Sequence, residues 1–336
     1  MPAISTAKIT QAIINAFDEG DASAILVSFK ERTANPRKFV VQLSNQIFDI
    51  WVYAWTLTHG GGAARPKNEY RIQITGVESP LRLNPKGITL LVGYEPDTSC
   101  FAGFDVTKHT SFSTKSPSIQ IPITTLHDAL QNGLSFTRKG NEEIAIGIRS
   151  DQFLVYALNA ALFHQEGAIE GMPELLQKAT ELQEIVPKDI EKLPEERVKV
   201  IQEVNRYSRD STFRKRVITA YERRCAVTRM QLQLIDAAHI LPVGVEGSTD
   251  ETSNGICLSP TYHRAFDRAL IFLDDELKMR VNPRKESELI AANMHGGLAE
   301  FKSYLDKRVH LPYEKNLWPK LDYIRQANAI RSISYR

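Results

Sequence analysis

The sequence predicts an α+β protein with two domains joined by a helical connector. The chain has 336 residues, which is more than one compact hydrophobic core usually serves. Its first half alternates short β-branched and aromatic runs with turn residues, and a Glu- and Lys-rich stretch with leucines at helical spacing follows. We therefore expect a first domain over residues 1–165, a connector over 166–205 and a second domain over 206–336.

The first domain is expected to begin with an amphipathic surface helix between Ser5 and Gly20. Its apolar face carries Ile9, Ile13, Ala16 and Phe17, and no secretory signal is expected at this end. Strands are expected at 39–43, 70–75, 88–94, 101–104, 119–123 and 144–148, followed by a helix over 151–164. These elements predict a mixed, mainly antiparallel sheet, or a barrel-like one, packed with helices.

The second half is expected to begin after short connector helices that are separated by Pro173, Pro187 and Pro194. A helix over 211–221 is followed by a strand over 234–241, a polar loop and a tight turn at Asn254-Gly255. A strand over 256–258 then leads to a helix that starts at Ser259-Pro260, an N-cap and first-turn pair. The tail over 297–336 is expected to form two short helices.

The charges are unevenly distributed along the chain. The 42 basic and 40 acidic residues give a net charge of +2, but residues 166–205 carry −5 and residues 206–336 carry +6. A basic cluster opens the second domain: Arg206, Arg209, Arg214, Lys215, Arg216, Arg223, Arg224 and Arg229. Such a cluster suits contacts with a phosphate backbone, although a solvated helix face is the alternative.

Cysteine usage and hydropathy indicate the compartment and exclude some classes of site. Cys100, Cys225 and Cys257 form no C-x-x-C pair, so we expect neither a disulfide framework nor a structural zinc site. No apolar run has the length that a bilayer requires. We therefore expect a cytoplasmic protein without a membrane partner.

Three polar residues of the second domain suit phosphodiester hydrolysis. His263 and Asp267 are four residues apart on one helix, so they share a face and are spaced to hold one cation. The hairpin is expected to bring His239 to the same point. A divalent ion stabilises charge on a phosphate, and a neutral imidazole can take a proton from water. These two functions are sufficient for a nuclease.

The motifs in this region resemble the HNH endonuclease family, in particular its restriction-type branch with an A-A-H-I-x-P signature. They are Arg224-Cys-Ala-Val-Thr, Asp236-Ala-Ala-His-Ile-Leu-Pro, Asn254-Gly-Ile-Cys-Leu and His263-Arg-Ala-Phe-Asp, and the resemblance covers about residues 211–283. It implies a ββα-metal fold in which a β-hairpin and a helix hold one divalent ion. It further implies that His239 is the general base, that His263 is a metal ligand and that Asn254 braces the hairpin loop.

The sequence departs from the common family pattern at Ala238, where many members have a metal ligand. Asp236, at the same strand parity, and Asp267 are the candidates for the missing carboxylate, with Asp267 favoured by its helical spacing to His263. The structural alternatives are that His239 is a core histidine and that Asp267 pairs with Arg264 or Arg268. The expected cofactor is one divalent metal ion, Mg²⁺ or Mn²⁺.

The resemblance implies that double-stranded DNA is the partner. The arginines expected to contact its backbone are Arg214, Arg216, Arg223, Arg224, Arg264 and Arg268. A homodimer is expected, because one active site per chain faces one phosphodiester.

The resemblance to restriction-type HNH enzymes implies that the first domain recognises the target, and three readings stay open: a base sequence, a modified base, which would make the enzyme modification-dependent, or a small signalling ligand. Trp51, Tyr53 and Trp55 alternate on one possible strand face, where they either cage a base or belong to an ordinary core. Two alternatives for the whole chain stay open. One is a defence nuclease gated by a small ligand, and the other is a DNA-binding module whose HNH site has decayed.

Overall fold

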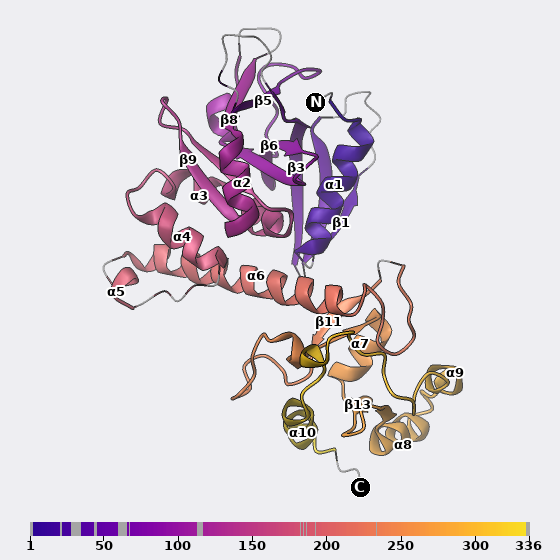
Figure 1. The fold of residues 1–336 in the computed structure, drawn as a ribbon. Coiled ribbons are helices and arrows are strands. Elements are labelled where there is room, and N and C mark those ends of the chain that lie inside the picture. Colours follow the sequence, from indigo (N-terminus) through magenta and orange to yellow (C-terminus); the bar gives the residue numbers. More distant parts are fainter. Residues whose placement is uncertain are drawn as a thin grey trace. The chain divides into compact units, whose positions relative to one another are not determined.

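The computed structural model describes residues 3–20, 22–27, 35–43, 46–59, 66, 68–112, 117–181, 183, 185, 187–191, 193–232 and 234–333. The chain forms two compact units, Met1–Ser211 and Thr212–Arg336 (Figure 1). The boundary between them falls within the long helix α6, Glu195–Ala220. Among the described residues, no helix is both long and apolar enough to cross a bilayer.

Within the described residues, unit 1 is built on an open sheet of seven strands in the order β1-β2-β3-β6-β7-β10-β9. All neighbouring strands are antiparallel except β3 and β6, which run parallel with Ile50 opposite Ile88. The strands are β1 Ser23–Leu26, β2 Arg37–Leu43, β3 Gln46–Thr56, β6 Ile88–Glu95, β7 Cys100–Phe104, β9 Leu134–Arg138 and β10 Ile144–Ile148.

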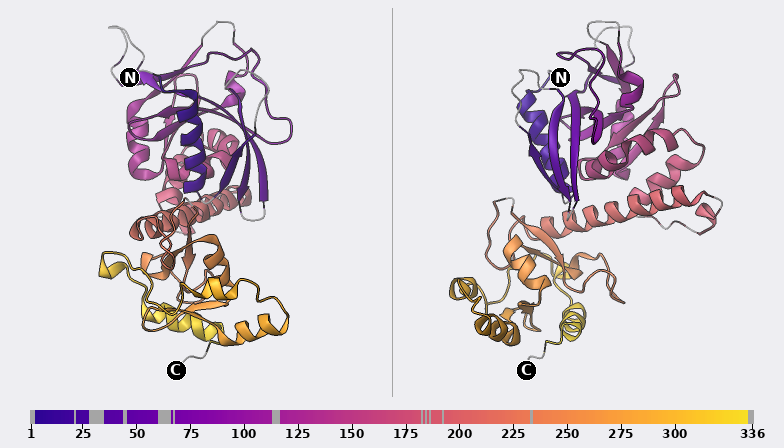
Figure 2. Two further views of the ribbon diagram at one scale, coloured as in Figure 1. Left: turned by 90° about the vertical axis from the view of Figure 1, so that its right-hand side faces the viewer. Right: turned by 180° about the vertical axis from the view of Figure 1, so that it is seen from behind.

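Helices cover one face of this sheet, and a small second sheet with one helix covers part of the other (Figures 1 and 2). The first face packs against α1, Thr6–Glu19, and α3, Phe153–Glu166. The opposite face packs against α2, Ile123–Asn132, and the sheet β4-β5-β8, formed by Thr58–His59, Glu69–Gln73 and Ser118–Pro122. Short 3₁₀ turns lie at Val106–His109 and Ser150–Gln152.

The amphipathic helix expected at the start of the chain is present as α1. The side-chain hydroxyl of Ser5 caps it by accepting from the N–H of Lys8, and the helix ends at Gly20. Its buried residues are Ile9, Ile13, Ala16 and Phe17, as the apolar spacing predicts. The α+β class is therefore confirmed, but no pairing of β1 with β9 is present in the described part of the sheet, so it is not a closed barrel.

The segment expected as a connector contains helices α4, Met172–Glu181, and α5, Pro187–Ile190, followed by the first part of α6. Met172, Leu176 and Ala179 of α4 are buried in the same core as α1 and α3. Ile201 and Val204 of α6 join them. These helices therefore supply part of the apolar core of unit 1.

Unit 2 has its own core around two short two-stranded sheets and the helix α7, Pro260–Asp267. The strands are β11 Asp236–His239, β12 Gly255–Leu258, β13 Ile271–Leu273 and β14 Met279–Val281. A 3₁₀ turn at Thr252–Asn254 precedes β12. The later helices are α8 Pro283–Ala291, α9 Leu298–Lys302 and α10 Leu321–Ile330, with a 3₁₀ turn at Lys315–Leu317. Helix α10 packs against β13, and Asn328 donates from Nδ2 to the carbonyl of Leu273 at 2.8 Å.

Candidate active site

Strands β11 and β12 and helix α7 form the frame of the candidate site. The strands pair antiparallel with His239 opposite Gly255 and Asp236 opposite Leu258. Helix α7 starts with Ser259 at the N-cap and Pro260 in its first turn, as expected from the sequence. The order strand, loop, strand, helix is therefore present.

The tight turn predicted at Asn254-Gly255 is wrong. The φ of −119° at Gly255 is extended backbone and starts β12, so Asn254-Gly255 is not a tight hairpin turn. A Cβ atom at this position would lie 2.3 Å from Cγ2 of Val217 and 3.0 Å from the ring of Phe213. Glycine is needed here because helix α6 packs directly on the strand backbone.

His239 lies at the end of β11 and is held on two sides. Its ring stacks on Phe213, with centroids 3.7 Å apart and an interplanar angle of 10°. Its Nε2 lies 3.0 Å from Oδ1 of Asp250. When Nε2 carries the proton and donates to this carboxylate, Nδ1 is the unprotonated nitrogen. Among the described residues, Nδ1 has no hydrogen-bond partner, so it is available to a water molecule.

The surroundings of His239 favour the neutral ring that a general base requires. Burial lowers the pKa of His239 below its ordinary value, although the hydrogen bond and the negative charge of Asp250 oppose this effect. A positive charge on His263 lowers the pKa of His239 further, which places the two imidazoles within electrostatic range. At neutral pH the ring is therefore mainly neutral.

Asp250 and Phe213 are two residues of this site that the sequence did not single out. Asp250 lies in an irregular loop, where no periodicity fixes its distance from His239. Phe213 has a weak signal, because it lies four residues before Val217 and eight before Tyr221 on one buried helical stripe. That spacing indicates a core position but not a ring partner for His239.

Asn254 is completely buried and ties both ends of the loop together. Its Oδ1 accepts from the N–H of Leu241 at 2.9 Å. Its Nδ2 donates to the carbonyls of Leu241 at 3.2 Å and Thr249 at 2.8 Å and to the hydroxyl of Ser248 at 3.3 Å. The backbone carbonyl of Asn254 accepts from Ile240, next to His239. These bonds fix the loop that carries Asp250.

The C-terminal segment supports the same loop. Thr249 Oγ1 lies 2.7 Å from the hydroxyl of Tyr323, and Lys320 Nζ lies 2.5 Å from the carboxylate of Glu251. The guanidinium of Arg331 donates to the carbonyl of Ile240 at 3.3 Å. Contacts between residues 69 to 91 positions apart in the sequence therefore stabilise the surroundings of His239.

His263 lies between the two candidate carboxylates. Its Nδ1 is 3.2 Å from Oδ2 of Asp236, and its Nε2 is 3.4 Å from Oδ2 of Asp267. The side chain of Asp236 is 32% exposed, whereas that of Asp267 is 58% exposed. Burial alone would raise the pKa of Asp236, but hydrogen bonds and charges from His263 and Arg214 hold it below its ordinary value. Asp236 is thus kept ionised.

The imidazole nitrogen of His263 and the carboxylate oxygen of Asp236 are a donor pair for a divalent ion that keeps several waters. Among the described residues, no group of three or more His, Cys, Asp or Glu side chains is arranged to hold a metal. Two ligands on adjacent octahedral positions, each about 2.1 Å from the ion, lie about 3.0 Å apart. The atoms of Asp236 and His263 are separated by 3.2 Å. Mg²⁺ usually keeps several waters and takes only a few protein ligands beside phosphate oxygens.

The six arginines expected to contact DNA have different surroundings. Arg214 is buried, donates to the carbonyl of Ile235 at 3.0 Å and lies 3.6 Å from Oδ1 of Asp236. Arg216 is exposed and donates to the carbonyl of Asp250 at 2.7 Å. Arg223, Arg264 and Arg268 are exposed, and Arg224 is half-buried. Arg214 therefore faces the interior beside Asp236, whereas the other five have surface access.

Comparison with known proteins shows two family matches. Residues 225–274 match a family described as HNH endonuclease. This segment contains β11, β12 and α7 with His239, Asn254 and His263. It is an HNH endonuclease domain. The resemblance to this family is therefore confirmed for these residues, and the chain contains an HNH endonuclease domain.

The other matches concern the first unit and the chain as a whole. Residues 48–157 match a family described as Methylase-associated X1. A solved structure entitled "Modification dependent TagI restriction endonuclease" is similar with 15% identity and a TM-score of 0.28 over 82% of this chain and 80% of that chain. That TM-score is too low to define a common arrangement. No curated protein matches the chain.

Proposed function

We propose that this HNH endonuclease cleaves double-stranded DNA as a restriction-type enzyme that requires one divalent ion, Mg²⁺ or Mn²⁺. The observation that carries the proposal is the combination of a carboxylate-bound imidazole at His239 with a second imidazole and carboxylate at His263 and Asp236. General-base catalysis and metal binding thereby have separate groups.

His239 acts as the general base in this proposal. Nδ1 takes a proton from the water that attacks the phosphorus atom. The carboxylate of Asp250, which is hydrogen-bonded to Nε2, stabilises the resulting imidazolium. Phe213 holds the ring plane by stacking, and Asn254 fixes the loop that carries Asp250. Neither of these two residues needs to touch the substrate.

Asp236 and His263 would hold the ion, and Asp267 would orient the imidazole of His263 from its other nitrogen. This assignment differs from the preference that helical spacing gives to Asp267. Asp236 is favoured because it is less exposed and because Arg214 holds it from the interior. When bound, the ion supplies stabilisation of negative charge on the phosphate and the leaving oxygen.

The DNA backbone would lie against the exposed arginines Arg216, Arg223, Arg264 and Arg268, with Arg224 beside them. The first unit would recognise the target and sense base modification. The match of residues 48–157 to a methylase-associated family supports this division, because a restriction-type nuclease must distinguish modified from unmodified DNA. Cleavage of both strands would require two chains, since each has one site.

Plasmid nicking with matched variants tests the proposal. The protein without substitutions is expected to nick at least one of three plasmids, unmodified, methylated or hydroxymethylated, in the presence of Mg²⁺ or Mn²⁺. EDTA is expected to abolish this nicking. His239→Ala is expected to bind the same DNA without cutting it. Intact plasmid of every type, with DNA binding retained by the unmodified protein, would instead indicate a DNA-binding module with an inactive site.

A further inference from the structure

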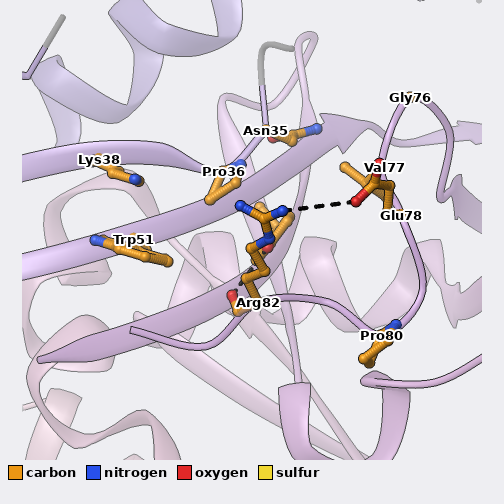
Figure 3. Close-up of a pocket in the computed structure, with 10 residues that line it drawn as sticks. Asn35, Pro36, Lys38, Trp51, Gly76, Val77, Glu78, Pro80 and Arg82 are labelled. Atoms are coloured by element: carbon orange, nitrogen blue, oxygen red, sulfur yellow. Dashed lines mark hydrogen bonds and ion pairs between the residues drawn. The ribbon is translucent and has the colours of Figure 1, made fainter. Parts of the chain in front are cut away.

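A pocket of about 590 Å³ lies on unit 1, where β2 and β3 meet the segment 76–82 (Figure 3). Its walls combine aromatic, cationic and rigid side chains: Trp51, Tyr53, Lys38, Arg82, Pro36 and Pro80. This volume is in the range of sites that bind small molecules and cofactors. It belongs entirely to unit 1 and does not depend on the nuclease site.

Trp51 forms the open aromatic wall of this pocket. It lies directly opposite Lys38 across the β2-β3 ladder, on the sheet face away from the core residue Val52. Tyr53 is 2% exposed, and its hydroxyl donates to the carbonyl of Arg82 at 2.9 Å. Tyr53 therefore fixes the facing segment, while the half-buried indole of Trp51 stays accessible to a ligand.

The cage of three aromatic rings considered from the sequence is not formed. The ring of Trp55 packs against Tyr53, with centroids 6.3 Å apart and an interplanar angle of 12°. Its Nε1 donates to the carbonyl of Thr75 at 3.2 Å. The pocket thus has one accessible indole with cations beside it.

The charges around Trp51 determine which ligands fit. The ammonium of Lys38 lies 4.2 Å from the centre of the Trp51 ring. The side chain of Arg82 is 74% exposed, and its guanidinium lies 3.8 Å from the carboxylate of the still more exposed Glu78 (Figure 3). An exposed pair of this kind stabilises little, so a phosphate can replace Glu78 as partner of the arginine. Two cations disfavour a quaternary ammonium ligand and favour an anion joined to a flat ring.

We propose that this pocket binds a nucleotide, with its base stacked on Trp51 and its phosphate held by Lys38 and Arg82. A base stacked on an aromatic side chain strengthens binding by about 5- to 150-fold. The contact between Lys38 and an exposed ring is worth a factor of about 2 to 5, which is less than a base can gain by stacking on the same ring. The nucleotide is either a base extruded from DNA or a free nucleotide, and the first source rests on the proposed function.

Binding measurements on the full chain in a His239→Ala background separate these sources, because the DNA is then not cut. One arm uses fluorescence anisotropy with short duplexes that carry unmodified bases, 5-methylcytosine, 5-hydroxymethylcytosine or N6-methyladenine. The other arm uses calorimetry with free nucleoside monophosphates and cyclic dinucleotides. Trp51→Ala is compared with Trp51→Phe, which keeps a ring, and with Trp55→Phe, which changes a tryptophan outside the pocket.

Trp51→Ala is expected to weaken binding of one duplex type or one nucleotide by about 5- to 150-fold, with little change for the two phenylalanine variants. Lys38→Ala and Arg82→Ala are expected to weaken the same ligand and to reduce the salt dependence of its binding. If the pocket variants weaken binding of free nucleotides only, the pocket is a nucleotide site that does not receive a base extruded from DNA. Equal binding by Trp51→Ala and the parent for every ligand would overturn the proposal. Plasmid nicking is measured separately, so its failure would concern the nuclease alone.

Discussion

Replacement of Asp250 by asparagine tests how the protein controls the protonation of His239. The carboxylate of Asp250 lies 3.0 Å from Nε2 and favours the protonated ring. Its removal is therefore expected to lower the pKa of His239 further. On the acidic limb of the pH–rate profile the rate falls because His239 becomes protonated and can no longer act as a base. This limb is expected to move to lower pH.

The size of this shift follows from the geometry. A hydrogen bond to a charged group contributes about 1.5–3 kcal/mol. The side chains are 14% exposed for His239 and 27% exposed for Asp250, so some screening by water favours the lower value. About 1.4 kcal/mol corresponds to one pH unit. We expect the acidic limb to move down by about one unit and the plateau rate to fall at least about tenfold, because the imidazolium loses its partner.

The assay is the single-turnover rate of DNA cleavage as a function of pH at saturating metal. Glu246→Gln is the matched control, because it removes one negative charge from the exposed part of the same loop. It is expected to leave both the limb and the plateau in place. An acidic limb that does not move in Asp250→Asn, or that moves equally in Glu246→Gln, would refute the role of Asp250.

Three further predictions concern packing, acid stability and metal binding. Gly255→Ala is expected to destabilise unit 2 by about 1–3 kcal/mol in chemical denaturation, because its Cβ would meet Val217. Adding Val217→Ala is expected to restore part of the lost stability. No recovery in the double variant would contradict this cause. Burial opposes ionisation of Glu143, but His109 and Lys139 at 2.7 Å each lower its pKa to about 2. Because its folded pKa is depressed, Glu143 contributes about 3 kcal/mol to the free energy of unfolding above pH 4.5, and this contribution is lost as the pH falls toward 2. The Glu143→Gln variant should lack this part of the acid dependence. An unchanged pH profile of the unfolding free energy in that variant would contradict the prediction. Asp236→Asn is expected to weaken Mn²⁺ binding at least about tenfold in calorimetry, whereas Asp275→Asn, which loses a surface pair with Arg325, should bind normally; equal affinities would exclude Asp236 as a ligand.

Local signals predicted the elements that depend on neighbouring residues. Ser5, Gly20 and the apolar spacing between them predicted helix α1, and Ser259-Pro260 predicted the start of α7. Both depend on capping and on periodicity within a few turns. The parallel pairing of β3 with β6 was not predicted, because it joins strands separated by a long crossover and leaves no local pattern.

The candidate site was predictable only where its residues belong to short motifs. The motifs contained His239, Asn254 and His263, but they gave no information about Asp250, which reaches His239 through loop geometry. The burial of Arg214 had a signal that charge counting hid. It lies three residues before Val217 and seven before Tyr221, so it belongs to the buried stripe of the helix.

Chemical rescue tests the central claim that the imidazole of His239 takes the proton from water. His239→Ala opens a slot beside the ring of Phe213, which lies 3.7 Å from the missing imidazole, so imidazole added to the buffer can occupy it. We expect DNA cleavage to be lost in this variant and to return in proportion to added neutral imidazole, with no such rescue for His263→Ala. Cleavage by His239→Ala at the unmodified rate without imidazole would contradict the account.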